Sequence, residues 1–223
     1  MKEYSKSALN KVKRGANRAV YDVDKINKIL DAGFIGYVSY VYDGQAISLP
    51  MAYGRDKNKI YLHGSLKNRM LLSVLASESM SITVMHLDAL VLARSGLHHS
   101  VNYRSATIFG KARRIEDSVE KEKILKCIVD HMMIGRWEEL RPINQKELNA
   151  TLVIEMTIES ASAKIRDVGV KDEKDDEKLP IWAGILPIKQ VAEFPISDEL
   201  LPEHVEVPDH VIQYYNINKA DRN

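Results

Sequence analysis

The sequence contains a single cysteine and has almost no net charge. Cys127 alone cannot form an internal disulfide, and it cannot supply a Cys-x-x-Cys zinc or redox motif. The 32 Lys and Arg residues are balanced by 31 Asp and Glu residues, which leaves a net charge of +1. This balance excludes the strongly basic field of a protein that coats nucleic acid or an anionic membrane. An anionic ligand must therefore be held by a local group of side chains.

Long hydrophobic runs are also missing. No stretch approaches the 18 or more apolar residues of a membrane-spanning helix, and residues 1–13 lack the apolar core of a secretory signal. We therefore expect a cytoplasmic protein that has neither nucleic acid nor a membrane as a partner. The composition, 45% hydrophobic and 28% charged, is that of an ordinary globular protein, and 223 residues favour one domain over two.

Several signatures of catalytic or metal sites are absent. There is no Gly-x-Ser-x-Gly elbow, no Walker motif and no Gly-x-Gly-x-x-Gly, so hydrolases and P-loop or Rossmann nucleotide sites have no support. His98 and His99 cannot easily share one ion because adjacent strand residues point to opposite faces, and we predict no metal site. The acidic segment 167–178 is predicted to be an exposed loop, in which the carboxylates of residues 172–177 titrate normally.

The sequence does contain many short strand patterns and few helical ones. Apolar and β-branched runs predict strands over residues 35–42, 46–53, 59–63, 80–86, 90–93, 103–115 and 150–158. Asp43-Gly44 predicts a tight hairpin turn, and helical spacing predicts helices over 22–32, 66–76 and after the N-cap Asp117. Because helices and strands do not alternate, we expect a mainly β protein with peripheral helices, in which an antiparallel barrel closes on itself.

The segment from His63 to Arg69 is the most informative one. A strand is expected to end at Gly64, with Ser65 as the helix N-cap and with Lys67 and Arg69 in the first helical turn. Cations oppose the helix dipole there, whereas the free N–H groups of a helix N-terminus attract anions. The pattern favours a phosphate site, and the alternative is that Lys67 and Arg69 are solvated surface charges.

Two further segments combine polar and aromatic residues. Residues 98–105 are dense in hydrogen-bonding side chains immediately before an apolar strand, and such residues usually face a ligand or a subunit interface. Trp182 stands in an apolar segment before Gly184. It is either a core or interface aromatic or a flat ring that packs against a flat cofactor.

Several motifs together resemble the pyridoxamine 5'-phosphate oxidase-related flavin-nucleotide-binding proteins, with the nitroimidazole-reductase-like members as near relatives. The motifs are residues 14–18, 63–69, 84–94, 99–105, 135–137, 162–166 and 179–184. They occur in the family's order over roughly residues 14–188. The resemblance implies one FMN-binding split antiparallel β-barrel domain over residues 1–223, with an N-terminal arm (1–21) and a C-terminal extension (about 189–223). It also implies a homodimer with one FMN per subunit in clefts between the two chains.

The resemblance further implies which residues contact the FMN. Ser65, Lys67 and Arg69 resemble the phosphate ligands, and Arg18 adds charge from the N-terminal arm. The backbone of residues 50–52 resembles the strand that lies along the isoalloxazine edge. The full set of candidate cofactor-binding residues is Arg18, Pro50, Met51, Ala52, His63, Gly64, Ser65, Lys67, Asn68, Arg69, Asn102, Tyr103, Ser105 and Trp182.

Two departures from the oxidase bear on the substrate. Leu66 stands where the oxidase has an arginine, and residues 185–188 replace the stretch that holds the substrate phosphate there. Oxidation of pyridoxamine phosphate is therefore not expected. We predict instead an FMN-dependent oxidoreductase that acts on a small molecule by flavin hydride transfer, without a specified catalytic side chain. The alternatives are a non-catalytic protein that binds or stores flavin, haem or a deazaflavin, and a dimeric scaffold with an empty cleft.

Overall fold

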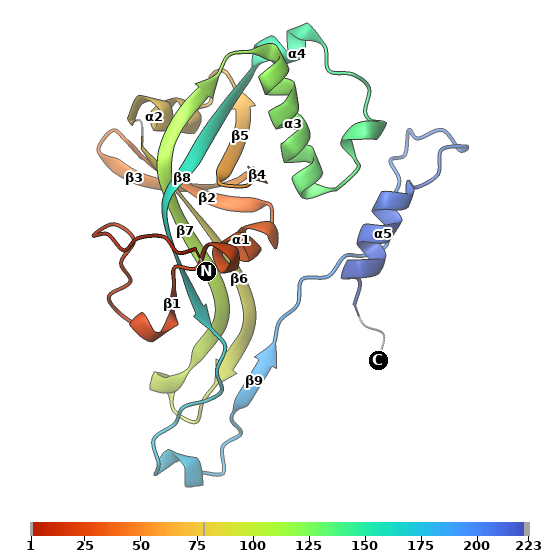
Figure 1. The fold of residues 1–223 in the computed structure, drawn as a ribbon. Helices are drawn as coiled ribbons and strands as arrows, with labels where there is room; N and C mark the ends of the chain where they lie inside the picture. Colours follow the sequence, from red (N-terminus) through yellow and green to blue (C-terminus); the bar gives the residue numbers. More distant parts are fainter. Residues whose placement is uncertain (1, 78, 221–223) are drawn as a thin grey trace.

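The computed structural model describes residues 2–77 and 79–220. This part of the chain forms one nine-stranded antiparallel sheet that curls into a split barrel, with helices on its outside (Figure 1). The strands are β1 (Ala19–Val20), β2 (Ile35–Tyr42), β3 (Gln45–Ala52), β4 (Gly54–Asp56), β5 (Lys59–Ser65), β6 (Met80–Leu92), β7 (Ser100–Ile115), β8 (Thr151–Arg166) and β9 (Gly184–Pro187). The helices are α1 (Val23–Asp31), α2 (Arg69–Ser77), α3 (Ser118–Met132), α4 (Gln145–Ala150) and α5 (Asp209–Asn218).

The strand order shows where the barrel is split. The sheet runs β3-β2-β6-β7-β8-β5-β4, while β1 adds to β8 and β9 adds to β6. The two end strands, β3 and β4, are consecutive in the chain and are joined only through Tyr53, without pairing with each other. The mainly β fold with peripheral helices is confirmed, but the sheet is open along this seam, where we had expected closure.

Local sequence signals explain the regular parts of the sheet. The β2–β3 hairpin pairs Tyr42 with Gln45 around the predicted tight turn, and positive φ angles at Asp43 (50°) and Gly44 (70°) are those of a type I′ turn. The two strands predicted over 80–86 and 90–93 are a single strand, β6, with a bulge between Leu87 and Ala89.

Strand β8 continues beyond the predicted end at residue 158. Its second half alternates the buried Ala161 and Ala163 with the half-buried Ser160 and Ser162. These small and hydroxylated side chains carry a weak strand signal, and pairing with β7 on one side and β1 on the other holds them in the sheet.

Two apolar clusters stabilise the fold. The larger one fills the inside of the curled sheet, where Leu30 of α1 and Leu71 of α2 meet Val38, Ile82 and Ile108 of the strands. The smaller one packs α3 against the outside of β5 and β8. Each fully buried Leu or Ile contributes about 1.5–3 kcal/mol relative to an exposed one, so both clusters position the segments around the seam.

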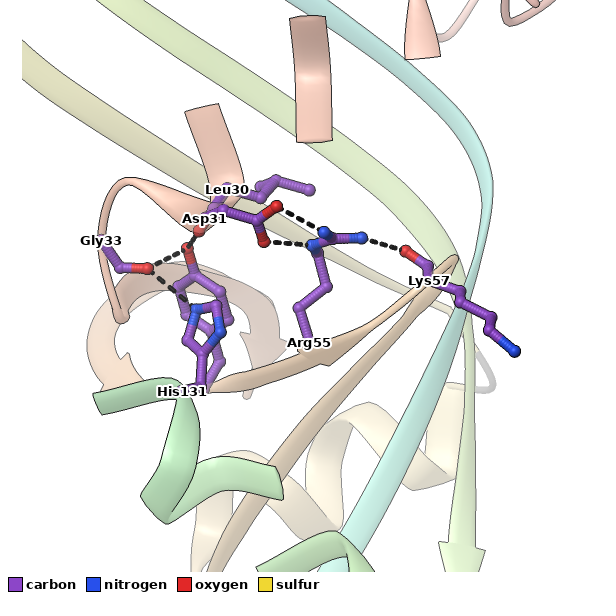
Figure 2. A network of polar contacts seen from close by, with 7 residues as sticks. Leu30, Asp31, Gly33, Arg55, Lys57 and His131 are labelled. Atoms are coloured by element: carbon purple, nitrogen blue, oxygen red, sulfur yellow. Dashed lines mark hydrogen bonds and ion pairs between the residues drawn. The ribbon is translucent and has the colours of Figure 1, made fainter. Parts of the chain in front are cut away.

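A polar network ties the end of α1 to the seam and to α3 (Figure 2). The Tyr53 hydroxyl lies 2.5 Å from Leu30 O and 2.9 Å from Gly33 O, and His131 Nε2 donates to Gly33 O at 3.0 Å. Arg55 binds both carboxylate oxygens of Asp31 and also donates to a backbone carbonyl of the β4–β5 turn. The carbonyls of Leu30 and Gly33 are thus satisfied by Tyr53 of the seam and His131 of α3, while Arg55 of β4 holds the Asp31 side chain.

The C-terminal extension leaves the barrel after β9 and ends in α5, which lies beside the loop that follows α3 (Figure 1). His210 of α5 contacts Glu139 at 3.3 Å, and Phe194 packs edge-on against Tyr215 at 5.4 Å between ring centroids. Ile196 and Leu200, which lie between Phe194 and His210 in the sequence, are almost fully exposed. None of the helices in the described ranges is long and apolar enough to cross a membrane.

Candidate functional site

The site begins where β5 passes into α2. Ser65 still pairs with Thr151 of β8, after which the chain turns: Asn68 N donates to Ser65 O at 2.9 Å, and Lys67 N donates to Ser65 Oγ at 3.3 Å. The helix starts only at Arg69, and Asn68 caps it by accepting a hydrogen bond from Leu71 N at 3.1 Å. The predicted N-cap at Ser65 is therefore wrong, because strand pairing holds Ser65 extended and a turn must intervene before the helix.

Gly64 permits the close packing of this turn against the strand. A Cβ atom at Gly64 would lie 3.0 Å from Asn68 Nδ2 and 3.1 Å from a methyl carbon of Leu71. These distances are tighter than ordinary contacts, so the side chains of Asn68 and Leu71 would have to shift to admit a side chain at this position. Gly64 thus permits the present packing of the turn against the strand.

A hollow of about 330 Å³ opens beside this helix start. One part of its wall comes from the turn that is predicted to bind the phosphate. The other part comes from β3, the strand that is predicted to lie along the edge of the flavin ring. The lining residues are Tyr40, Leu49, Pro50, Met51, Asn68, Arg69 and Met70. One side is therefore cationic and amide-rich, and the other side is apolar. Tyr40, Leu49 and Met70 carried no functional signal in the sequence, because they read as ordinary strand and helix residues.

The cations of the turn have no acidic partner in the described ranges. Arg69 lies with its guanidinium 4.5 Å from the centre of the Tyr42 ring, a cation–π contact that leaves the charge uncompensated. Lys67 is exposed and precedes the helix, so only Arg69 lies in the first turn. His63, on β5, keeps an exposed surface, yet desolvation lowers its pKa. The arrangement can hold an anion at the N-terminus of a nine-residue helix.

The remaining candidates lie elsewhere in the same chain. Arg18, Asn102, Tyr103 and Ser105 surround the far half of β8, toward its end at Arg166. Asn102 is buried, and its Oδ1 atom accepts hydrogen bonds from Arg166 and from Val168 N. One chain alone therefore does not bring these residues to the hollow beside α2.

Trp182 also lies away from the hollow, next to β9. Its side chain is 68% exposed, and its ring folds over Gly184, where a Cβ atom would lie 2.8 Å from Trp182 Cζ2. The tryptophan is therefore not a core residue of this chain, and its ring remains available to a ligand or a second subunit.

The outer face of the sheet exposes apolar side chains near these residues. Tyr37 of β2 is 49% exposed and Met85 of β6 is 54% exposed. Alternation along antiparallel strands places them on the same face as Ser105 of β7, which pairs with Met85. Exposed apolar surface of this kind marks interaction sites.

The acidic loop is more structured than expected. Asp172 accepts hydrogen bonds from Arg94 N at 3.1 Å and from the Arg94 guanidinium at 2.8 Å. Desolvation acts to raise the pKa of Asp172, but these hydrogen bonds and the Arg94 charge outweigh it and lower the pKa. The prediction that these carboxylates titrate normally is wrong for Asp172, because tertiary contact gives it a partner remote in the sequence. No group of three or more His, Cys, Asp or Glu residues that could hold a metal occurs in the described ranges.

The sequence matches the profile of the pyridoxamine 5'-phosphate oxidase family over residues 22–165. The chain belongs to this family. The match covers the strands β2 to β8, the turn 65–68 and the hollow beside α2, so the predicted family is confirmed. No curated protein matches the sequence.

Solved structures share the fold, two of them over nearly the whole chain. The flavocytochrome Anf3 from Azotobacter vinelandii is 33% identical, with 93% of this chain and 97% of that chain covered and a TM-score of 0.88. An FAD and haem binding protein from Mycobacterium smegmatis is 28% identical over 88% and 97% of the two chains, with a TM-score of 0.84. A 5-nitroimidazole antibiotic resistance protein from Bacteroides thetaiotaomicron shares the fold at 20% identity, 66% and 86% coverage and a TM-score of 0.57.

Proposed function

We propose that this protein binds a flavin nucleotide in the hollow beside α2. The observation that carries the proposal is that one hollow joins the cationic turn at Asn68 and Arg69 to the apolar strand at Pro50 and Met51. A flavin nucleotide has this same division, with a phosphate at one end and a flat ring at the other.

The donors in and beside the hollow fit such a molecule: Asn68 and Arg69 line it, and Ser65 and Lys67 are their neighbours in the turn. Ser65, Lys67, Asn68 and Arg69 would hold the phosphate with a hydroxyl, two cations and the free N–H groups of the helix start. Residues 50–52 would border the ring, while His63 and Gly64 precede the turn on β5. When bound, the flavin supplies hydride transfer, and the chain positions it and sets its electrostatic surroundings.

We further propose that the site is completed by a second copy of the chain. Arg18, Asn102, Tyr103, Ser105 and Trp182 lie away from the hollow in their own subunit, so they could contact the flavin only across a homodimer interface. The exposed apolar residues of the outer sheet face support this arrangement. The proposed activity is that of a cytoplasmic oxidoreductase that acts on a small molecule.

Two observations bear on which flavin is bound, and they favour different nucleotides. The family resemblance favours FMN, whereas the Mycobacterium smegmatis protein, similar over 88% of this chain, is described as binding FAD and haem. Both nucleotides carry the ribityl phosphate that the turn 65–69 would hold, so we propose FMN or the FMN half of FAD at this position.

A second candidate function, haem binding together with flavin, has its own support. The flavocytochrome and the FAD and haem binding protein cover 93% and 88% of this chain, so each of them extends into the part beyond residue 165, where the family match ends. The nitroimidazole resistance protein covers only 66% of the chain. We propose that the C-terminal extension distinguishes proteins that bind both flavin and haem from split-barrel proteins that lack the extension.

The released chromophore tests both candidates. Freshly purified protein is denatured, and the supernatant is examined by absorbance, fluorescence and mass. FMN or FAD is expected, and a Soret band in the native protein would establish haem as well. Protein that releases neither flavin nor haem would contradict both candidates and favour the empty scaffold.

The double variant Lys67→Ala and Arg69→Ala tests the position of the phosphate. Each charge-assisted contact contributes about 1.5–3 kcal/mol, so flavin affinity should fall at least about tenfold in a titration followed by flavin fluorescence. The matched control makes the same replacements at Lys123 and Lys146, two exposed lysines on α3 and α4. This control should bind flavin like the wild type. Wild-type affinity in the Lys67 and Arg69 variant would overturn the assignment.

A further inference from the structure

Three cationic side chains gather at the far end of β8. Lys164 and Arg166 stand near its end, and β1 places Ala19 opposite Lys164, so the adjacent 3₁₀ helix Ala16–Arg18 lies beside them. A Cβ atom at Gly15 would lie 3.8 Å from Lys164 Nζ and 3.9 Å from Arg18 Cδ, so both side chains flank one point. We name Arg18, Lys164 and Arg166 the β8-end cluster.

Arg166 is the buried member of this cluster. It is only 5% exposed, and its guanidinium donates to Asn102 Oδ1, Val168 O and Gly169 O, all of them neutral acceptors. Its Nε atom has no hydrogen-bond partner. Desolvation and the nearby charge of Arg18 both lower the pKa of Arg166, so the surroundings disfavour its positive charge.

The described ranges provide no counter-ion for the β8-end cluster, since none of its three members forms an ion pair there. A buried charge without a counter-ion is destabilising, and three cations at one place repel one another. Such an arrangement is stable when a bound anion supplies the missing negative charge. Arg18 and Lys164 are half-buried, so they leave an approach from solvent to the buried guanidinium.

We infer that the β8-end cluster is a binding site for a phosphate group. Guanidinium groups match phosphate oxygens in bidentate geometry, and a phosphate of about two negative charges balances three cations better than a single carboxylate does. The site is separate from the turn 65–69 in the same chain. Ser65 pairs with Thr151 at the start of β8, and at about 3.3 Å per residue the two places are roughly 40 Å apart along the strand.

Two sources could supply this phosphate group. One is the adenylate phosphate of FAD bound across a dimer interface, and this source rests on the proposed flavin function. The other is a small phosphorylated compound or free phosphate, which does not depend on that function.

Inorganic phosphate is the first probe. Its affinity is measured by isothermal titration calorimetry on the purified full chain and on Arg18→Gln, Lys164→Gln and the exposed control Lys123→Gln. Affinity should fall about tenfold or more in the first two variants and stay unchanged in Lys123→Gln. Arg18 and Lys164 are chosen because they are half-buried, whereas replacing Arg166 could disturb the end of β8.

The flavins are the second probe. If Lys164→Gln weakens FAD binding about tenfold and leaves FMN binding unchanged, the phosphate group is that of the FAD adenylate. If both flavins bind normally and only inorganic phosphate is lost, the ligand is a separate phosphate compound. Equal affinities of all variants for phosphate, FMN and FAD would overturn the inference. If the protein binds no flavin but its phosphate binding still depends on Arg18 and Lys164, the proposed flavin function is refuted and the phosphate site stands.

Discussion

Asn68 shows how a single residue sets the geometry of the candidate site. Its side chain caps α2, while its neighbours Lys67 and Arg69 carry the two charges, one before the helix and one in its first turn. The cap satisfies one helix N–H and leaves others free for an anion. The sequence drew attention to the charges, but the residue that organises them is the uncharged one between them.

Replacement of Asn68 by alanine should therefore lower both stability and flavin affinity. Loss of an N-cap costs about 1 kcal/mol, to be measured as the free energy of unfolding in urea. Flavin affinity should fall as well, because the helix start loses its fixed direction. Asn17→Ala, at an exposed asparagine with no side-chain hydrogen bond in the described ranges, is the control. An Asn68→Ala protein as stable as this control would show that Asn68 is not the cap.

At the scale of elements, the end of α1 is held by groups that come from distant parts of the chain. His131 of α3 and Tyr53 of the seam both bind Gly33 O, and His86 of β6 donates to Ile29 O at 2.9 Å. A Cβ atom at Gly33 would lie 2.8 Å from His86 Cε1, so a side chain at this position would displace the His86 ring and disturb its hydrogen bond to Ile29 O. Glycine at position 33 therefore permits this close approach of the His86 ring to the end of α1.

The His131 contact predicts a dependence of stability on pH. Desolvation lowers the pKa of His131 below 6.5, although the hydrogen bond to Gly33 acts in the opposite direction. The unfolded chain therefore binds the proton first. The contribution to the free energy of unfolding is fully present above about pH 6.5 and is lost as the pH falls from there through the lowered pKa.

Urea unfolding at several values between pH 7.5 and 5 measures this effect. His131→Gln, which can still donate to Gly33 O but does not titrate, should lose less stability on acidification than the wild type. His204→Gln, at an exposed histidine of the C-terminal extension, is the matched control and should follow the wild type. Parallel profiles for His131→Gln and the wild type would contradict the assignment.

At the scale of the whole molecule, the candidate residues form two groups that one chain keeps apart. The hollow beside α2 contains one group, and the far half of β8 carries the other. Between them lies an outer sheet face with the exposed Tyr37 and Met85. A two-fold dimer through this face is self-complementary, and it is the arrangement by which one flavin could reach both groups.

The double variant Tyr37→Glu and Met85→Glu should convert a dimer into a monomer, because it places charges in the apolar contact. Sedimentation velocity measures the oligomeric state, and flavin content should fall together with the dimer. Val119→Glu, at an exposed position of α3, should change neither. A wild-type monomer, or a dimer that tolerates both charges, would refute this interface.

The sequence by itself determined most strands, the Asp43-Gly44 hairpin, the family and four of the residues that line the hollow, namely Pro50, Met51, Asn68 and Arg69. These features rest on periodicity, turn chemistry and local motifs, which act over a few residues. Tertiary structure alone decided the open seam at Tyr53, the cap at Asn68, the Arg94–Asp172 pair and the gathering of Arg18 with Lys164 and Arg166. The physical reason is that burial, strand pairing and the meeting of charges depend on contacts between residues far apart in the chain, and no local pattern encodes those contacts.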